Sequence, residues 1–424
     1  MQVPNANFTE GGASGRDVDV LIVGGGQAGG RTAEALRAQG FKGRIALVGR
    51  ETWLPYERPA LSKAYLMGQE DESEMALHLA GFWEEQSIDL YLGCEVSQLD
   101  RAGQRAMLAD GRWLGYRHLV VATGGDPRRL DVAGDGAAEV VALRTIEDSQ
   151  RIRAGLKAGS KVLVIGAGVI GMELASSARA MGAQVEVLEA GPRVMGRILC
   201  PQTSDWLAAL HQAAGVTLHL NTRLEGIDRG GSGLKVRMTH LDGSPRTSEA
   251  DLVVAAIGVS VSQPFLRDSG LGDEDGMEVD TCCRSRVDPH CYAAGDVART
   301  PVPYFGRPSR QETWRNADNQ AKAVAASILG GTQPYEETPW MWTDQHGRNI
   351  QVVGVPQAGM QQVTRGEPGA GPFSVLWVAD GRLRGGVLVD SGRERRTLEQ
   401  LVRAGCPVDA NLLNKPEVPL KSLL

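Results

Sequence analysis

The sequence predicts an α/β protein with two β–α–β domains and a smaller α+β domain toward its C-terminal end. A short apolar run that ends in glycines is followed by a helix-forming stretch and a second apolar run, which is the pattern of a β–α–β unit. The same pattern recurs later, and the two glycine runs begin at Gly24 and Gly166. This separation is too long for a short-period repeat, so it favours two separate domains.

The predicted elements follow in chain order. The first unit has a strand at 19–23, a helix at 27–39 and a strand at 44–48, and the second has a strand at 161–165, a helix at 169–181 and a strand at 184–188. Apolar runs at 119–122 and 252–257 lead into glycines and indicate crossovers between the domains. Beyond Pro334 the composition changes, and strand-like runs at 350–355 and 373–378 indicate the α+β domain.

Composition and charge exclude several classes of protein. The 424 residues are 42% hydrophobic and 23% charged, which is ordinary for a globular protein with a full core. The net charge of −6 lacks the basic excess of a nucleic-acid binder. No apolar run reaches the roughly 18 residues of a membrane span. Residues 1–16 lack the basic and apolar regions of a signal peptide, so we expect a flexible tail and a cytoplasmic protein.

The six cysteines form no pattern typical of a metal site. None of them belongs to a CxxC or CxxxxC pair, which are the spacings that zinc and iron–sulfur sites typically use. Cys282 and Cys283 are neighbours, and on a strand they would point to opposite faces. We therefore expect scattered reduced thiols and no metal bound by this chain.

The first glycine run has the chemistry of a dinucleotide-binding loop. It fits GxGxxG directly after a strand and before a helix. Glycines permit the tight turn and a close approach of the backbone to a pyrophosphate, and the helix N-terminus supplies unpaired N–H groups. We expect binding through Gly24, Gly26, Gln27, Ala28 and Gly29.

The second glycine run repeats this arrangement and completes the pattern for a second dinucleotide. It consists of Gly166, Gly168, Val169, Ile170 and Gly171. Two dinucleotide sites in one chain imply two different dinucleotides. A bound flavin, which receives hydride, and a diffusing nicotinamide cofactor, which delivers it, are the simplest explanation.

An acidic residue at the end of the second strand of each unit is expected to bind ribose hydroxyls. In the second unit this residue is Glu189, which predicts NADH over NADPH because a carboxylate repels a 2′-phosphate. Arg193 lies close by in sequence and partly opposes this preference. In the first unit Arg50 stands where the acid is expected, and Glu51 is the candidate to replace it.

Beyond the two glycine loops, the chain from about Asp17 to its end resembles the FAD-dependent ferredoxin reductases of aromatic-ring dioxygenase and bacterial cytochrome P450 systems. Residues 54–63 resemble the RPPLSK motif of that family, with Ala60 in place of the second proline. Other matching segments are 122–124, 143–145, 292–296, 312–317, 342–345 and 401–405. Arg50 departs from the family, which usually has an acid there for the adenosine ribose.

The resemblance implies a glutathione-reductase-like fold with two Rossmann-type dinucleotide-binding domains plus a C-terminal α+β domain. It implies an FAD-binding domain at 17–124 and 252–331, an NAD-binding domain at 125–251 and a C-terminal domain at 332–424.

The resemblance also implies cofactor contacts outside the loops. For FAD these are Glu51, Arg58, Lys63, Val96, Ala122, Thr123, Gly124, Arg144, Gly295, Asp296, Glu312, Thr313 and Trp314. For NAD they are Glu173, Glu189, Ile257 and Gly258.

Four residues are implied by the resemblance to act in electron transfer or to surround the flavin ring. The resemblance places Lys63 near the flavin N5, where a cation favours the negative charge of the reduced flavin. Glu173 is implied to pair with Lys63 and to yield when the nicotinamide docks. Trp314 and Trp342 are implied to lie around the flavin ring, with Trp342 on the path to the acceptor. The alternatives from the residues alone are a surface lysine, a first-turn acid and core tryptophans.

The absence of a dithiol decides between activities of this fold. Disulfide reductases carry a cysteine pair beside the flavin, whereas residues 53–63 contain no cysteine. We therefore expect electrons to pass from NADH through FAD to a [2Fe–2S] ferredoxin, of the Rieske type, that serves a terminal oxygenase. A rubredoxin reductase, an NADH oxidase and a redox-sensing flavoprotein are the alternatives. A monomer and a homodimer are both compatible with the sequence.

Overall fold

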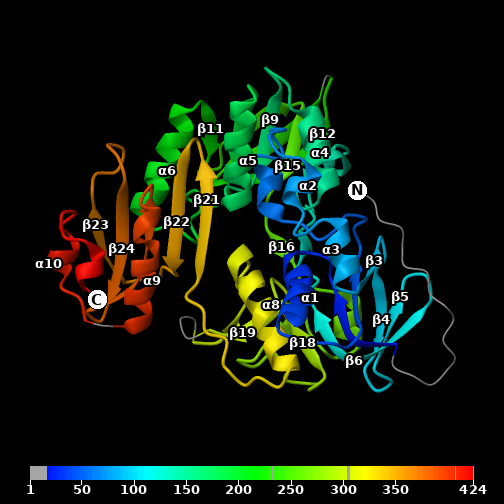
Figure 1. Cartoon of the computed structure of the whole chain (residues 1–424). Coiled ribbons are helices and arrows are strands. Elements are labelled where there is room, and N and C mark those ends of the chain that lie inside the picture. The colour runs from blue at the N-terminus through cyan, green and yellow to red at the C-terminus, as the bar shows by residue number, and fades with distance from the viewer. Residues whose placement is uncertain (1–16, 232, 303–305, 406, 424) are drawn as a thin grey trace. The chain divides into compact units, whose positions relative to one another are not determined.

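The computed structural model describes residues 17–231, 233–302, 306–405 and 407–423, and the chain divides into two compact units (Figure 1). Unit 1 contains the described parts of Met1–Pro59, Asp71–Asp126 and Val259–Glu337. Unit 2 contains those of Ala60–Glu70, Pro127–Gly258 and Thr338–Leu424. The predicted tail at 1–16 lies outside the described residues.

Unit 1 is built on a sheet with a parallel part and an antiparallel extension. The strand order is β3-β2-β1-β6-β5-β4, and β18 also pairs with β6. Helices α1 and α8 lie side by side in this unit (Figure 1). The elements are β1 (Val18–Val23), α1 (Gln27–Ala38), β2 (Ile45–Gly49), β3 (Ile88–Leu92), β4 (Val96–Asp100), β5 (Arg105–Leu108), β6 (Trp113–Val121), β18 (Cys291–Ala293) and α8 (Trp314–Ile328).

The central strand β1 is buried on both faces, which explains its continuous apolar sequence. Because side chains alternate along a strand, Val20 and Ile22 pack into one core cluster and Leu21 and Val23 into another.

Smaller elements complete unit 1. They are α2 (Glu72–Met75), α3 (Ala80–Glu85), β16 (Val259–Ser260), α7 (Pro264–Asp268), β17 (Met277–Glu278), β19 (Ala298–Pro301) and β20 (Pro308–Ser309).

Unit 2 contains the second β–α–β unit in a parallel sheet of order β11-β10-β9-β15-β8, with a separate antiparallel sheet β12-β13-β14. The elements of this part are β8 (Val141–Ala142), α4 (Ile146–Gly155), β9 (Lys161–Ile165), α5 (Val169–Ala180), β10 (Gln184–Leu188), α6 (Pro201–Ala213), β11 (Val216–His219), β12 (Thr222–Arg229), β13 (Leu234–His240), β14 (Pro245–Ala250) and β15 (Leu252–Ala255).

The rest of unit 2 is an antiparallel sheet of order β21-β22-β25-β24-β23 with helices beside it, which matches the α+β character predicted for this segment. Its elements are β21 (Trp340–Gln345), β22 (Arg348–Gly354), β23 (Gln361–Arg365), β24 (Phe373–Ala379), β25 (Arg382–Val389), α9 (Arg395–Ala404) and α10 (Ala410–Leu413). The predicted α/β fold class is thereby confirmed.

The predicted element ends differ from the observed ones by small amounts. The predicted helix at 27–39 ends at Ala38, because Gln39 is its C-cap. The predicted strand at 252–257 ends at Ala255. Within the described part of the chain, no helix has both the length and the apolar character needed to cross a bilayer.

Candidate functional site

The glycine loop of unit 1 leaves open space at its middle glycine. Gly24 has a φ of +121°, and a Cβ there would lie 2.1 Å from the carbonyl oxygen of Ala122. A Cβ at Gly29 would lie 1.8 Å from the carbonyl oxygen of Gly24. By contrast, a Cβ at Gly26 would meet only the Arg58 guanidinium, at 3.8 Å. The outer glycines therefore allow the tight turn and the close packing of α1 on β1, and the middle one borders free space.

Buried polar groups beside this loop lack protein partners. Both polar atoms of the Gln27 amide and the hydroxyl of Thr123 are buried without a hydrogen bond to any residue that the structure describes. Gly26 caps α1 without a side-chain hydrogen bond. Buried polar groups are normally satisfied, so these residues fit a bound dinucleotide such as FAD.

The segment at Gly295 and Asp296 approaches the same loop. A Cβ at Gly295 would lie 3.0 Å from the Cβ of Ala28, and the N–H of Gly295 donates to Gln320 over 2.8 Å. Asp296 acts electrostatically on Arg58. The structure therefore brings two predicted flavin segments together in unit 1.

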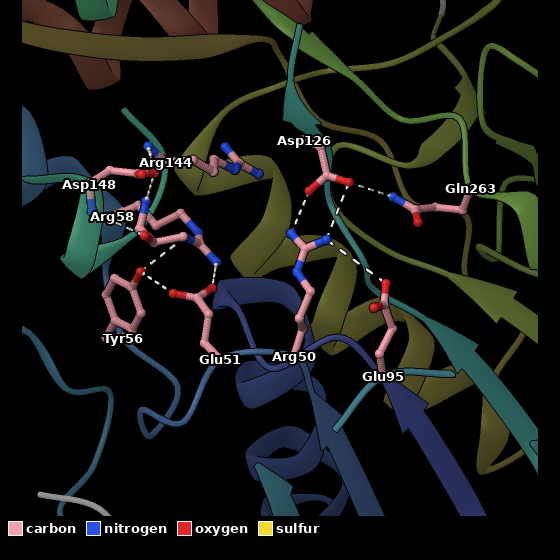
Figure 2. A network of polar contacts seen from close by, with 10 residues as sticks. Arg50, Glu51, Tyr56, Arg58, Glu95, Asp126, Arg144, Asp148 and Gln263 are labelled. Atoms are coloured by element: carbon pink, nitrogen blue, oxygen red, sulfur yellow. Dashed lines mark hydrogen bonds and ion pairs between the residues drawn. The ribbon is translucent and has the colours of Figure 1, made fainter. Parts of the chain in front are cut away.

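Glu51 and Arg58 form a partly buried pair (Figure 2). The Arg58 Nη2 donates to Glu51 Oε1 over 2.6 Å, and the Tyr56 hydroxyl donates to Glu51 Oε2 over 2.7 Å. Burial by itself would lower the pKa of Arg58, but Tyr56, Glu51 and Asp296 raise it above its ordinary value. Glu51 thus orients Arg58, and its contact to the ribose stays a prediction.

Arg50 is held by acidic residues that sequence reasoning did not single out (Figure 2). Its guanidinium lies 2.5 Å from Asp126 and 3.9 Å from Glu95, and Gln263 donates to Asp126 over 3.3 Å. The hydrogen bond from Arg50 to Asp126 is the largest cause of the raised pKa of Arg50. An acid is therefore present beside the end of β2, but this acid is Asp126, which follows β6 and not β2.

The remaining predicted FAD residues are spread over several elements. Val96 is buried in the core of unit 1. Glu312 pairs with Arg310 at 2.9 Å, Thr313 caps α8, and Trp314 is the first residue of that helix. Arg144 lies in unit 2, just before α4, where its N–H donates to Asp148 over 3.0 Å.

The glycine loop of unit 2 has the same geometry as the first. Gly166 has a φ of +102°, and its Cβ would lie 2.6 Å from the carbonyl oxygen of Ala256. A Cβ at Gly171 would lie 2.0 Å from the carbonyl oxygen of Gly166, whereas a Cβ at Gly168 would meet nothing within 4 Å. At the N-terminus of α5, Ile170 is 39% exposed. This loop fits a second dinucleotide.

Glu189 lies directly at the second loop. Its Oε2 accepts a hydrogen bond from the N–H of Ala167 over 2.8 Å, and its Oε1 accepts one from the N–H of Gly191 over 2.7 Å. Ile257 and Gly258 follow β15, the neighbour of β9 in the sheet. Glu189 is thus oriented by the backbone, and its contact to a ribose stays a prediction.

Lys63 and Glu173 meet in unit 2. The Lys63 Nζ lies 3.2 Å from Glu173 Oε1. The carboxylate of Glu173 also accepts hydrogen bonds from the hydroxyls of Ser62 and of Thr343, the latter over 2.7 Å. Glu173 is only 4% exposed. A buried charge needs such partners, so this carboxylate is held by one cation and two hydroxyls.

Trp342 lies next to this pair. Its ring is 5.4 Å from the Lys63 Nζ and stacks on Trp340, with centroids 5.3 Å apart and an interplanar angle of 17°. Lys63, Glu173 and Trp342 therefore form one cluster in unit 2. Their roles toward a flavin stay predictions.

A polar cluster that was not predicted from the sequence lies behind Glu173 and contains Thr343, Gln345 and His211. Thr343 and Gln345 lie inside the matched segment 342–345, and this position in a family motif could have indicated a functional role. His211 lies in the last turn of α6 and has no motif around it, so no local pattern points to it.

Lowering the pH from about 6.5 to 4 is expected to destabilise the protein through His211. Burial lowers the pKa of His211 from 6.5 to about 4, so in this range the unfolded chain binds a proton that the folded chain does not. Stability is lost as the pH falls, by roughly 3 kcal/mol for this group. The measurement is the free energy of unfolding of the wild type and of His211→Gln between pH 4 and 6.5. A stability difference between the two that does not change with pH would contradict the expectation.

Two of the buried thiols, Cys283 and Cys291, are poor candidates for redox chemistry. Burial raises the pKa of Cys291 to about 12 and also raises that of Cys283, and the thiolate is the reactive form. Among the described residues, no group of three or more His, Cys, Asp and Glu side chains is arranged to hold a metal ion.

Comparisons with known proteins agree with the motifs. A family profile described as pyridine nucleotide-disulphide oxidoreductase matches residues 18–321, and one described as reductase C-terminal matches residues 340–424. The anthranilate 1,2-dioxygenase system ferredoxin–NAD(+) reductase component of Burkholderia cepacia is 37% identical over 406 residues, which cover 95% of this chain and 98% of that protein.

Solved structures are similar over nearly the whole chain. The ferredoxin reductase for the CYP199A2 system from Rhodopseudomonas palustris matches with a TM-score of 0.90 and 36% identity, covering 96% of this chain and 99% of that one. The covalent putidaredoxin reductase–putidaredoxin complex matches with a TM-score of 0.90 and 34% identity, covering 96% of this chain and 98% of that one. The resemblance inferred from the motifs is confirmed.

Proposed function

The chain belongs to the pyridine nucleotide-disulphide oxidoreductase family, and on that premise we propose that it is a reductase component that passes electrons from NADH through FAD to a ferredoxin. The observation that carries the proposal is the presence of two glycine loops, each with free space at its middle glycine. We propose that the ferredoxin is a [2Fe–2S] protein of the Rieske type and serves an aromatic-ring oxygenase or a P450.

Each glycine loop is proposed to bind one of the two dinucleotides. FAD accepts two electrons as a hydride and releases them one at a time, which suits a one-electron partner. Gln27, Thr123 and the open N-terminus of α1 are proposed to hold FAD, in a domain formed by residues 17–124 and 252–331. Residues 125–251 are proposed to bind NADH, and 332–424 form the C-terminal domain. Lys63 is proposed to favour hydride transfer by its charge.

The direct experiment uses the full chain loaded with FAD. NADH should bleach the flavin absorption, and reduced product should accumulate when purified [2Fe–2S] ferredoxins are added. Rubredoxins in the same panel test the alternative acceptor, which the names of the relatives do not favour. Slow reoxidation by every ferredoxin, with a long-lived NAD complex, would instead favour a redox-sensing role. We further propose that the protein is cytoplasmic. We also propose that it is a monomer or a homodimer, and light scattering would distinguish the two.

Replacing Glu189 by Ala is expected to weaken the preference for NADH. The carboxylate is oriented by the N–H groups of Ala167 and Gly191, where it would bind the 2′-hydroxyl and repel a 2′-phosphate. We expect the ratio of kcat/KM for NADH over NADPH to fall by about tenfold or more, because the repulsion between the Glu189 carboxylate and the 2′-phosphate of NADPH is removed. An unchanged ratio would remove Glu189 from cofactor selection.

Replacing Trp342 by Ala is expected to slow the reduction of ferredoxin more than the reduction of a small dye by the same NADH-reduced protein. The reason is that a dye needs no path through the Trp342 side chain. The two rates are measured on one preparation, and Trp113→Ala provides a matched control, because Trp113 lies in β6 at the surface of unit 1. Equal losses for dye and ferredoxin would contradict a role in the path.

A further inference from the structure

Glu173 is the end point of a chain of hydrogen bonds that reaches deep into unit 2. Thr343 donates to Glu173 over 2.7 Å. Gln345 Nε2 lies 2.9 Å from Thr343 Oγ1, and Gln345 Oε1 lies 2.8 Å from His211 Nε2. His211 Nδ1 lies 3.1 Å from His346 Nε2. Thr343, Gln345 and His211 are all buried.

The direction of every hydrogen bond in this series follows from the Glu173 carboxylate at its end. A carboxylate paired with Lys63 accepts only, so the single hydroxyl proton of Thr343 points to Glu173. Thr343 must then accept from the Gln345 amide nitrogen, which turns the Gln345 oxygen toward His211.

The direction continues through the two histidines. His211 must carry its proton on Nε2 to serve the Gln345 oxygen, which leaves its Nδ1 as an acceptor for the Nε2–H of His346. Burial lowers the pKa values of both histidines, in agreement with a neutral His211, and the hydrogen-bond partners of the ring define its tautomer. All donors therefore point the same way, toward Glu173.

A chain of aligned hydrogen bonds restrains its end group more than a single bond does, because each donor polarises the next. The chain also joins separate elements, since His211 is in α6, Thr343 and Gln345 are in β21, and Glu173 is in α5. Simple packing of these elements would not need polar side chains in a buried position, where burial of such groups costs stability unless they are paired.

We propose that Thr343, Gln345 and His211 are positioning residues that hold the Glu173 carboxylate in place for Lys63. The proposal rests on the proposed function, in which the charge of Lys63 assists hydride transfer. If Thr343 no longer restrains Glu173, the carboxylate gains freedom and the Lys63 ammonium loses its fixed place. The rate of flavin reduction at saturating NADH should then fall, while the affinity for NADH changes little.

The kinetic test compares three variants by stopped-flow reduction of the FAD-loaded protein with NADH. Thr343→Val should lower the limiting rate by about tenfold, the effect of one lost hydrogen bond to a charged group. Thr343→Ser, which keeps the hydroxyl, should stay within about twofold of the wild type. Thr364→Val is the matched control, because Thr364 lies in the same sheet and its hydroxyl also donates a hydrogen bond to another element, here to Gln202 of α6.

A second test reads the tautomer directly and needs no turnover. In the full chain labelled with 15N-histidine, the His211 signal, assigned by its loss in His211→Gln, should show a neutral ring protonated on Nε2. In Thr343→Val this preference should weaken, since Gln345 is free to turn its amide. A His211 ring protonated on Nδ1 in the wild type would overturn the proposal.

The kinetic outcomes also separate this proposal from the function on which it rests. Equal rates for Thr343→Val and the wild type, or equal losses for the Ser and Val variants, would overturn the positioning role. A wild-type protein that binds FAD and is not reduced by NADH would instead overturn the proposed function.

Discussion

A Gly29→Ala variant is expected to be purified without FAD. The added Cβ would lie 1.8 Å from the carbonyl oxygen of Gly24, so the loop must open or α1 must move away from β1. Either change misplaces the N–H groups at the start of α1, on which the binding of a pyrophosphate depends. We expect the affinity for FAD to fall by about 100-fold or more, which corresponds to losing roughly 3 kcal/mol of binding.

The measurement is the ratio of flavin to protein absorbance after purification, followed by titration of the apoprotein with FAD. Gly81→Ala is the control, because Gly81 lies in α3 of the same unit and its added Cβ would meet nothing within 4 Å. Circular dichroism establishes that both variants are folded. A Gly29→Ala protein with a full complement of FAD would contradict the assignment of this loop.

A Gly171→Ala variant is expected to keep its FAD and to lose reduction by NADH. Its Cβ would lie 2.0 Å from the carbonyl oxygen of Gly166 and 3.3 Å from the Cβ of Ala256, so the loop before α5 must deform. The FAD loop lies in the other unit and is not changed. We expect kcat/KM for NADH to fall by about 100-fold or more, for the same physical reason as at Gly29.

The control here is Gly371→Ala, since Gly371 is also in unit 2 and its added Cβ would meet nothing within 4 Å. Chemical reduction of the flavin by dithionite should remain normal in Gly171→Ala, which separates a lost NADH site from a damaged flavin. A Gly171→Ala protein that had lost its FAD, like Gly29→Ala, would contradict the assignment of the two loops to separate dinucleotides.

The loops and their strands were predictable because they depend on local rules. A left-handed turn at Gly24 or Gly166 needs glycine, and the alternating or continuous apolar pattern of a strand is set by its own residues. The element ends were less predictable, as at Gln39, because a helix cap depends on a few local hydrogen bonds that several residues satisfy equally well.

The sequence by itself determined the two dinucleotide loops, the β–α–β units around them and the absence of a cysteine pair at 53–63, since each is a property of a short segment. Only the tertiary structure decided that Arg50 meets Asp126, 76 residues away, and that His211 reaches Gln345 across 134 residues. These pairs depend on how whole elements pack, because burial forces a polar group to find whichever partner the packing brings within about 3 Å.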